Sequence, residues 1–240
     1  MERNDLAARK RIELHARTNY AGVMGLPSAS DYAARMSDWG HKAIAFTDPN
    51  ETRCFPYVRK AFMESGIQPI YGTELTLSAH ADIVRHYHVM VLSKNREGIV
   101  TINQMITQGY SNWQNDSDGL FCVDRTELET RRNNLLVGSS CNEGEVVNAL
   151  RNGKTDNEIL SIMEFYDYIE VQPMQNEQKR FDRHEEDYCS EIRRTIRLAQ
   201  MAGKPVVAVS NASFLDPEES MALTIIRADR GDRPKTSEIS

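Results

Sequence analysis

A histidine and an arginine stand two residues apart near the start of the chain, where metal chemistry is conceivable. His15 and Arg17 follow the alternating residues Ile12, Glu13 and Leu14, a pattern typical of a half-buried strand that ends at His15. Side chains two positions apart on a strand point to the same side, so these two would face one volume. Two histidines there could clamp a metal ion, whereas a histidine and an arginine could not.

Other side chains suited to chemistry lie at or near the exits of predicted strands. They are His15, Asp48, Glu74, Cys141, Gln172 and Asn211. In barrels of alternating strands and helices, functional side chains gather where the strands exit. His88 breaks this rule because it begins its apolar run. It would reach the same face if residues 74–77 and 87–91 paired as a hairpin-like extension.

Strand-like and helix-like segments alternate along the chain and would position these residues. The seven predicted strands are 11–15, 43–47, 69–77, 88–92, 135–138, 168–171 and 205–209. Helices are predicted between Ser28 and Gly40 and at 56–64, 97–108, 126–130, 143–150, 156–165 and 187–202, with a polar loop at 110–118. Ser28 and Asp31 fit a capping box. This alternation predicts an α/β fold with a mainly parallel sheet, closed or nearly closed as a barrel.

Composition excludes several classes of protein. With 240 residues, 40% hydrophobic and 27% charged, the chain can bury a core as one large domain or two small ones. A formal net charge of −6 argues against a surface that tracks nucleic-acid phosphates. We expect a cytoplasmic protein without a membrane span, because neither a secretory signal nor about 18 consecutive apolar residues occur. The four cysteines are far apart, which indicates reduced thiols.

Seven segments carry a family resemblance over nearly the whole chain. They are residues 11–18, 39–48, 70–74, 87–95, 137–146, 165–173 and 203–217. In this order they resemble a PHP (polymerase and histidinol phosphatase) domain, particularly that of bacterial DNA polymerase III alpha subunits of the PolC type. The resemblance implies a distorted seven-stranded (β/α)7 TIM-like barrel as a single domain over residues 1–240. Residues 1–10 would be an N-terminal extension and residues 227–240 a polar C-terminal tail.

The resemblance also implies a reduced set of metal ligands. Active PHP domains hold up to three metal ions. Here the residual ligands would be Glu74, His88, Cys141, His15 and Asn211, whereas Arg17, Met24, Pro49 and Ser213 replace expected donors. Those replacements are poor metal ligands. We therefore expect no metal or at most one divalent ion, zinc or manganese. A lone ion cannot clamp both the attacking and the leaving oxygen of a phosphoester, so phosphoesterase activity should be absent.

Arg17 suggests that a positively charged side chain has replaced a metal ion. We hypothesise that its guanidinium occupies a former ion position and pairs with Glu74, because an unpartnered buried carboxylate would otherwise take up a proton. On that hypothesis Arg17→Ala should lower the free energy of unfolding by about 3–5 kcal/mol. A change below about half a kcal/mol would reject it.

These features predict a non-catalytic PHP domain that acts as a scaffold in DNA replication. Its partners would be the remaining domains of a DNA polymerase III alpha subunit, a DNA-directed DNA polymerase, here without the exonuclease inserted between the segments matching Glu74 and His88. The alternatives are a stand-alone metal-dependent phosphoesterase of the histidinol-phosphatase type and a stand-alone interaction protein. Cys141 could be a nucleophile, but a buried inert thiol fits better, and His86 is expected to face solvent.

Overall fold

The computed structural model describes residues 7–78, 86–113, 121–173 and 185–229. The chain divides into two compact units, and β3 contributes residues to both. The first unit comprises residues 1–48, 52–71 and 210–240, and the second comprises residues 49–51 and 72–209. Both units combine strands with helices, so the predicted α/β class is confirmed.

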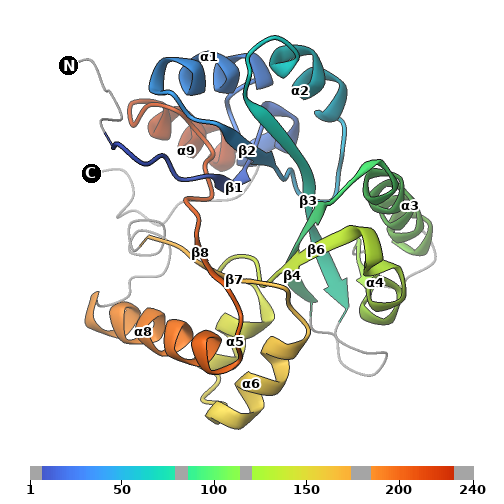
Figure 1. Ribbon diagram of the computed structural model, residues 1–240, viewed down its shortest axis with the longest axis vertical. Helices are drawn as coiled ribbons and strands as arrows, with labels where there is room; N and C mark the ends of the chain where they lie inside the picture. The colour runs from blue at the N-terminus through green and yellow to red at the C-terminus, as the bar shows by residue number, and fades with distance from the viewer. Residues whose placement is uncertain (1–6, 79–85, 114–120, 174–184, 230–240) are drawn as a thin grey trace. The chain divides into compact units, whose positions relative to one another are not determined.

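The first unit contains three parallel strand segments and the helices beside them (Figure 1). The strands are β1 (Glu13–Ala16), β2 (Ala43–Phe46) and the first residues of β3 (Gln68–Ser78); β2 pairs with both of the others. The helices are the 3₁₀ helix η1 (Asn19–Met24), α1 (Ala29–Trp39), α2 (Phe55–Phe62) and α9 (Glu219–Asp229).

Helix α1 forms where local sequence signals coincide. Ser28 and Asp31 make the predicted capping box, and Gly40 ends the helix in the left-handed conformation (φ 72°), which glycine adopts without strain. The buried ring of Tyr32 packs edge-on against Phe46 of β2, with ring centroids 5.5 Å apart. This contact places the first turn of α1 beside the last residue of β2.

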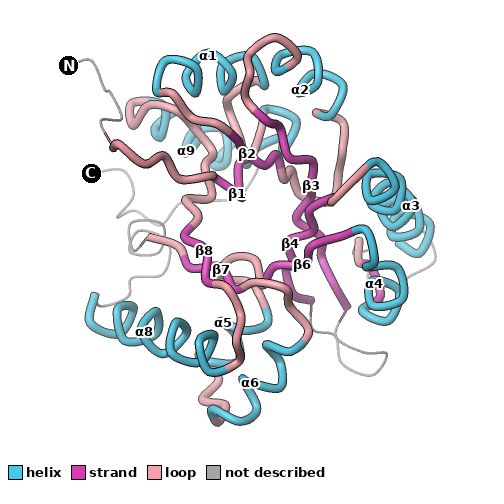
Figure 2. The backbone as a smooth tube through the Cα atoms, in the orientation of Figure 1, coloured by secondary structure: helices cyan, strands magenta, loops and turns pink. Residues whose placement is uncertain are grey.

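The second unit contains the rest of β3 and five further strands among its described residues. They are β4 (His86–Ser93), β5 (Val123–Asp124), β6 (Leu135–Gly138), β7 (Ile169–Val171) and β8 (Val206–Ala208). Its helices are α3 (Arg96–Trp113), α4 (Arg125–Arg131), η2 (Arg132–Asn134), α5 (Glu145–Arg151), α6 (Asp156–Glu164) and α8 (Glu185–Met201). β7 and β8 lie side by side as a parallel pair (Figure 2).

Strand directions in the second unit differ from the prediction of a mainly parallel sheet. β4 pairs antiparallel with both β3 and β6, while β5 pairs parallel with β3. The hairpin-like pairing that would bring His88 to the same face, which the sequence left open, is present: Glu74 lies opposite Met90 and Thr76 opposite His88. The described residues contain eight strands, one more than predicted, and the seven-stranded barrel stays a prediction.

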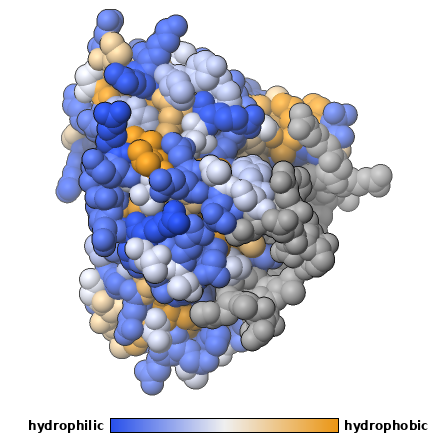
Figure 3. All heavy atoms as spheres, turned by 90° about the vertical axis from the view of Figure 1, so that its right-hand side faces the viewer, coloured by the Kyte–Doolittle hydropathy of each residue, from blue (hydrophilic) through white to orange (hydrophobic). Residues whose placement is uncertain are grey.

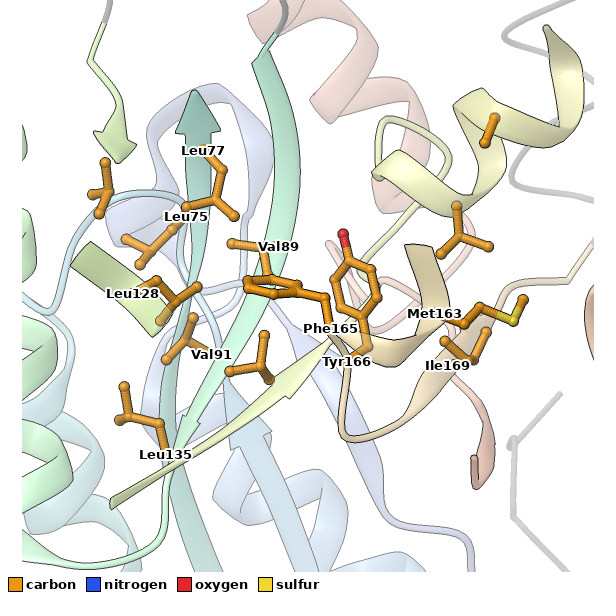
Figure 4. Close-up of a cluster of buried hydrophobic side chains, with 14 of the residues drawn as sticks. Leu75, Leu77, Val89, Val91, Leu128, Leu135, Met163, Phe165, Tyr166 and Ile169 are labelled. Carbon is orange, nitrogen blue, oxygen red and sulfur yellow. The ribbon is translucent and has the colours of Figure 1, made fainter. Parts of the chain in front are cut away.

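The hydrophobic core of the second unit fixes which face of β3 carries polar residues. Leu75 and Leu77 of β3 and Val89 and Val91 of β4 point into the core together with side chains from α6, such as Met163 (Figure 4). Glu74, which lies between core positions on the chain, must point to the opposite face. A shift of the pairing by one residue would turn Glu74 into the core and the apolar side chains out of it. Burial of those apolar side chains therefore favours the observed register.

Three predicted boundaries need correction. Helix α3 continues to Trp113, so residues 110–113 are not part of a polar loop, and the remaining predicted loop residues lie outside the described part of the chain. Helix α5 begins at Glu145 rather than at residue 143, because the preceding residues form a turn. Helix α9 runs through Asp229, into the predicted polar tail.

The surface is mostly polar on the face that carries α3 and α4, where hydrophobic side chains appear in separate small groups (Figure 3). Among the described residues, no helix combines the length and the apolar composition required to span a membrane. The four cysteines all lie within the described residues and form no disulfide.

Candidate metal centre

Three potential metal ligands of the second unit converge on the polar face of the β3–β4 hairpin. Glu74 and Thr76 share a face of β3, and Thr76 lies directly opposite His88. Glu74 and His88 are therefore diagonal neighbours, a pair whose longer side chains can meet. β6 pairs with β4 on its other edge, with Gly138 opposite Met90. Cys141 follows three residues later and reaches the same face.

The donor atoms of these residues have separations that suit a tetrahedral ion. The Oε1 atom of Glu74 lies 3.1 Å from His88 Nδ1 and 3.2 Å from Cys141 Sγ, and the sulfur lies 3.5 Å from the same nitrogen. Bonds of about 2.0–2.3 Å at tetrahedral angles separate neighbouring ligands of zinc by roughly 3.3–3.7 Å. The three atoms are thus spaced, to within a few tenths of an ångström, like three corners of a zinc coordination shell.

Glu74 is deeply buried, and its contacts show how the carboxylate is accommodated. Only 1% of its side chain is exposed. Besides Cys141 and His88, the hydroxyl of Ser140 donates to Oε1 at 2.8 Å. Ser140 adopts a left-handed backbone conformation (φ 59°), which is uncommon for a residue other than glycine. A buried carboxylate needs such donors or a cation, and here three polar groups meet at one oxygen.

His88 lies between two carboxylates, one facing each ring nitrogen. Nδ1 faces Glu74, and Nε2 lies 3.2 Å from Oε2 of Glu143. A neutral imidazole can donate a hydrogen bond from only one nitrogen. Both contacts are favourable when the ring carries two protons, or when a metal ion lies on the Nδ1 side and Nε2–H donates to Glu143. The arrangement therefore attracts positive charge to the space beside Glu74.

A tight turn after β6 supplies both Cys141 and Glu143. Gly144 N–H donates to the carbonyl of Cys141 at 2.8 Å, and His88 N–H donates to the carbonyl of Glu143 at 3.1 Å. A Cβ atom on Gly144 would overlap the carbonyl oxygen of Ser139 and lie 2.9 Å from that of Cys141. Only glycine fits there, so the turn and its connection to β4 depend on this residue.

The first unit contains a separate polar cluster around Asp48, at the end of β2. The main-chain N–H and the hydroxyl of Thr18 donate to the two oxygens of Asp48 at 2.6 and 2.5 Å. Burial raises the pKa of Asp48, while the hydrogen bonds from Thr18 and the positive charge of Arg17 oppose that rise. Asp48 is thus a fully buried carboxylate that accepts hydrogen bonds from Thr18 and lies near the positive charge of Arg17.

His15 and Asn211 lie on adjacent segments of the first unit. Ala212 N–H donates to the carbonyl of His15 at 2.9 Å, and Arg17 N–H donates to that of Ala212 at 2.8 Å. Asn211 is left-handed (φ 52°). The five predicted ligands therefore divide between the units: His15 and Asn211 lie in the first, and Glu74, His88 and Cys141 lie in the second. Arg17 and Glu74 also belong to different units, and their pairing stays a prediction.

Sequence reasoning did not identify Glu143 as part of the site, and its expectation for the exposure of His86 was inaccurate. No motif singles out Glu143, because its relation to His88 arises only from the turn. His86 is partly buried, contrary to the prediction that it faces solvent. Gln172 accepts a hydrogen bond from Asn142 at 3.4 Å, and its carbonyl accepts one from Tyr188 of α8 at 2.6 Å. Gln172 thus has contacts that link β7 to its neighbours.

Comparison with known proteins places these residues in a family context. Residues 13–173 match the family model described as "PHP domain". A DNA polymerase III PolC-type from Clostridium perfringens is 32% identical over 149 residues, covering 60% of this chain and 10% of that protein. Another DNA polymerase III PolC-type, from Lactococcus lactis, is 35% identical over 147 residues, covering 60% of this chain and 9% of that protein. The chain therefore spans about a tenth of the length of these relatives.

A solved structure shows a related fold at low sequence identity. An amidohydrolase from Chromobacterium violaceum, determined with bound sulfate and no metal, matches with a TM-score of 0.53 and 13% identity. The match covers 95% of this chain and 99% of the amidohydrolase. At this identity the likeness concerns the fold alone. Because the family model matches more than half of the sequence, this chain belongs to the PHP domain family.

Proposed function

We propose that this chain is the PHP domain of a replicative DNA polymerase of the PolC type, and that it is a structural scaffold without phosphoesterase activity. The PolC-type identity of its relatives, each about ten times longer than the matched segment, supports this role. The remaining polymerase domains would be its partners. In this proposal residues 1–240 form one distorted (β/α)7 barrel, in a cytoplasmic protein.

Glu74, His88 and Cys141 would hold one zinc ion. The observation that carries this proposal is the set of 3.1, 3.2 and 3.5 Å separations between their donor atoms. A thiolate sulfur favours zinc over manganese, which prefers oxygen ligands. When bound, zinc would act as a Lewis acid and would connect β3 and β4 to the turn that follows β6. The chain's own residues would supply the rest, with Ser140 donating to Glu74 and Glu143 accepting from His88.

The absence of hydrolysis is inferred from the side chains at the other ligand positions of the family. Arg17, Met24, Pro49 and Ser213 replace donors there, and none of these side chains is an ordinary zinc ligand. A single ion can polarise one oxygen but cannot stabilise the attacking and leaving oxygens together. His15 and Asn211 alone would not complete another site, because zinc needs three or four donors.

Helix α9 offers a feature consistent with a scaffold. Met221 and Ile225 stand one helical turn apart with 50% and 61% of their surface exposed, and Ile226 is 38% exposed. Apolar side chains gathered on one surface helix often mark contacts with other protein parts. Further domains of the polymerase are the occupants that this proposal assigns to it.

Metal analysis together with a phosphoester turnover assay tests the proposal. The purified protein, loaded with zinc and desalted, should retain at most one ion per chain and should show no EDTA-sensitive hydrolysis. Glu74→Gln and Cys141→Ser should lose the ion, whereas Glu164→Ala, an exposed change at the end of α6, should keep it. More than one ion per chain with EDTA-sensitive hydrolysis would overturn the scaffold and favour a stand-alone phosphoesterase.

A further inference from the structure

The turn at residues 141–144 presents two chemical groups to one imidazole ring. Cys141 Sγ lies 3.5 Å from Nδ1 of His88, and Glu143 Oε2 lies 3.2 Å from Nε2. The backbone reinforces this geometry, because His88 N–H donates to the carbonyl of Glu143 at 3.1 Å. A single short segment therefore fixes both sides of the ring.

A histidine ligand needs such an orienting partner. Either ring nitrogen can bind a metal ion, and the hydrogen bond made by the other nitrogen selects which one does. The His88 side chain is 23% exposed, so its ring is not completely enclosed by neighbouring atoms. A carboxylate that accepts from Nε2–H would hold the ring with Nδ1 directed at Glu74 and Cys141. It would also increase the electron density at the metal-binding nitrogen.

We propose that Glu143 is a positioning residue of the metal centre, which selects Nδ1 of His88 as the ligand atom by accepting a hydrogen bond from Nε2–H. This inference rests on the proposed zinc site and adds a residue to it. Glu143 would not touch the metal ion itself. Its contribution is to keep one tautomer and one ring orientation, so that the three donors are arranged before the ion arrives.

A surface ion pair is the competing interpretation of the same contact. The Glu143 side chain is 41% exposed, and exposed pairs contribute little to stability. That interpretation predicts that removing the carboxylate changes neither the affinity for zinc nor the protonation pattern of the imidazole. The two interpretations differ in measurable properties of His88 rather than in overall stability.

The test compares Glu143→Gln and Glu143→Ala with the unmodified protein and with Glu164→Ala. Glu164 is an exposed glutamate of the same unit at the end of α6, so it controls for loss of one negative charge. Zinc affinity is measured by competition with a chromophoric chelator. The nitrogen that carries the proton is identified by two-bond ¹H–¹⁵N NMR correlations of the His88 ring in the zinc-loaded protein.

We expect Glu143→Ala to weaken zinc binding by about 10–100-fold, the usual effect of losing a partner of a histidine ligand. Glu143→Gln should weaken it less, because the amide oxygen still accepts from Nε2–H. In the unmodified protein and in Glu143→Gln, the NMR pattern should show zinc on Nδ1 and the proton on Nε2. In Glu143→Ala that single pattern should be lost or mixed.

Two results would overturn the inference alone. One is a Glu143→Ala protein that binds zinc within twofold of the unmodified protein with the same His88 pattern. The other is zinc bound through Nε2 in the unmodified protein. An unmodified protein that takes up no zinc would instead overturn the proposed metal centre, and the positioning role with it.

Discussion

Replacing Gly144 by alanine should show how far stability and zinc binding depend on the close packing of the turn at residues 141–144. The usual effect of replacing a glycine, backbone strain, is absent at this position. Gly144 has φ −71° and ψ 158°, a conformation that alanine adopts without strain. The only obstacle is the added Cβ atom, which would overlap the carbonyl of Ser139 and lie 2.9 Å from that of Cys141. The turn must therefore open, and the cost comes from contacts rather than from backbone torsion.

The expected magnitude follows from the hydrogen bonds that depend on the turn. Opening it breaks the 2.8 Å bond from Gly144 to Cys141 and the 3.1 Å bond from His88 to Glu143. At about 0.5–1.5 kcal/mol each, these bonds account for roughly 1–3 kcal/mol. Because the turn also carries Cys141, zinc binding should weaken by at least about tenfold, the lower end for disturbing a ligand's surroundings.

Gly153→Ala is the matched control for this change. Gly153 has φ 69°, and no atom lies within 4 Å of a Cβ built there. Its replacement should cost about 1–2 kcal/mol from left-handed strain alone, without affecting zinc. Urea unfolding of the metal-free proteins and chelator competition provide the two measurements. The reasoning fails if Gly144→Ala binds zinc as tightly as Gly153→Ala does.

Three further changes probe other parts of the chain. Tyr32→Phe should lower the free energy of unfolding by about 1–2 kcal/mol, since the hydroxyl donates to two main-chain carbonyls at 3.0 and 3.1 Å, and an unchanged urea midpoint would contradict this. The pKa of Glu158 is lowered to about 2 by its hydrogen bond to Lys154, so its charge stabilises the fold above about pH 4.5 and progressively less as the pH falls toward 2. The urea midpoint of Glu158→Gln should therefore approach that of the unmodified protein as the pH falls over this range. Zinc at 100 times its Kd should raise the unfolding free energy by about 2.7 kcal/mol, and Cys141→Ser should abolish this gain in a thermal or urea titration.

Local signals in the sequence predicted helix α1 well, whereas α9 was not predicted. Ser28, Asp31 and Gly40 define both ends of α1, because a capping box and a left-handed glycine act within a few residues. The strand direction of β4 could not be derived in this way. Continuous alternation of strands and helices implies parallel pairing, but no helix separates β3 from β4 among the described residues, and the two strands pair as a hairpin.

The candidate site was predictable to the extent that it follows strand ends. Glu74 and Cys141 were selected because they lie near the exits of predicted strands. His88 needed the hairpin pairing as well, and that pairing depends on contacts between strands rather than on either strand alone. Glu143 carries no signal in the sequence, because its approach to His88 depends on the turn closed by Gly144.

The chemical character of the three donors also bears on hydrolysis. A carboxylate from Glu74 and a thiolate from Cys141 would neutralise both charges of a zinc ion, and the Glu143 carboxylate would add negative charge beyond the ligands. The power of zinc to ionise a bound water depends on the positive charge that its ligands leave to it. A zinc ion bound by three neutral histidines keeps a net charge of two with its ligands, whereas a zinc ion bound by Glu74, Cys141 and His88 would have a net charge of zero with its ligands. With this composition a bound zinc ion would lower the pKa of a coordinated water less than an ion held by three histidines would.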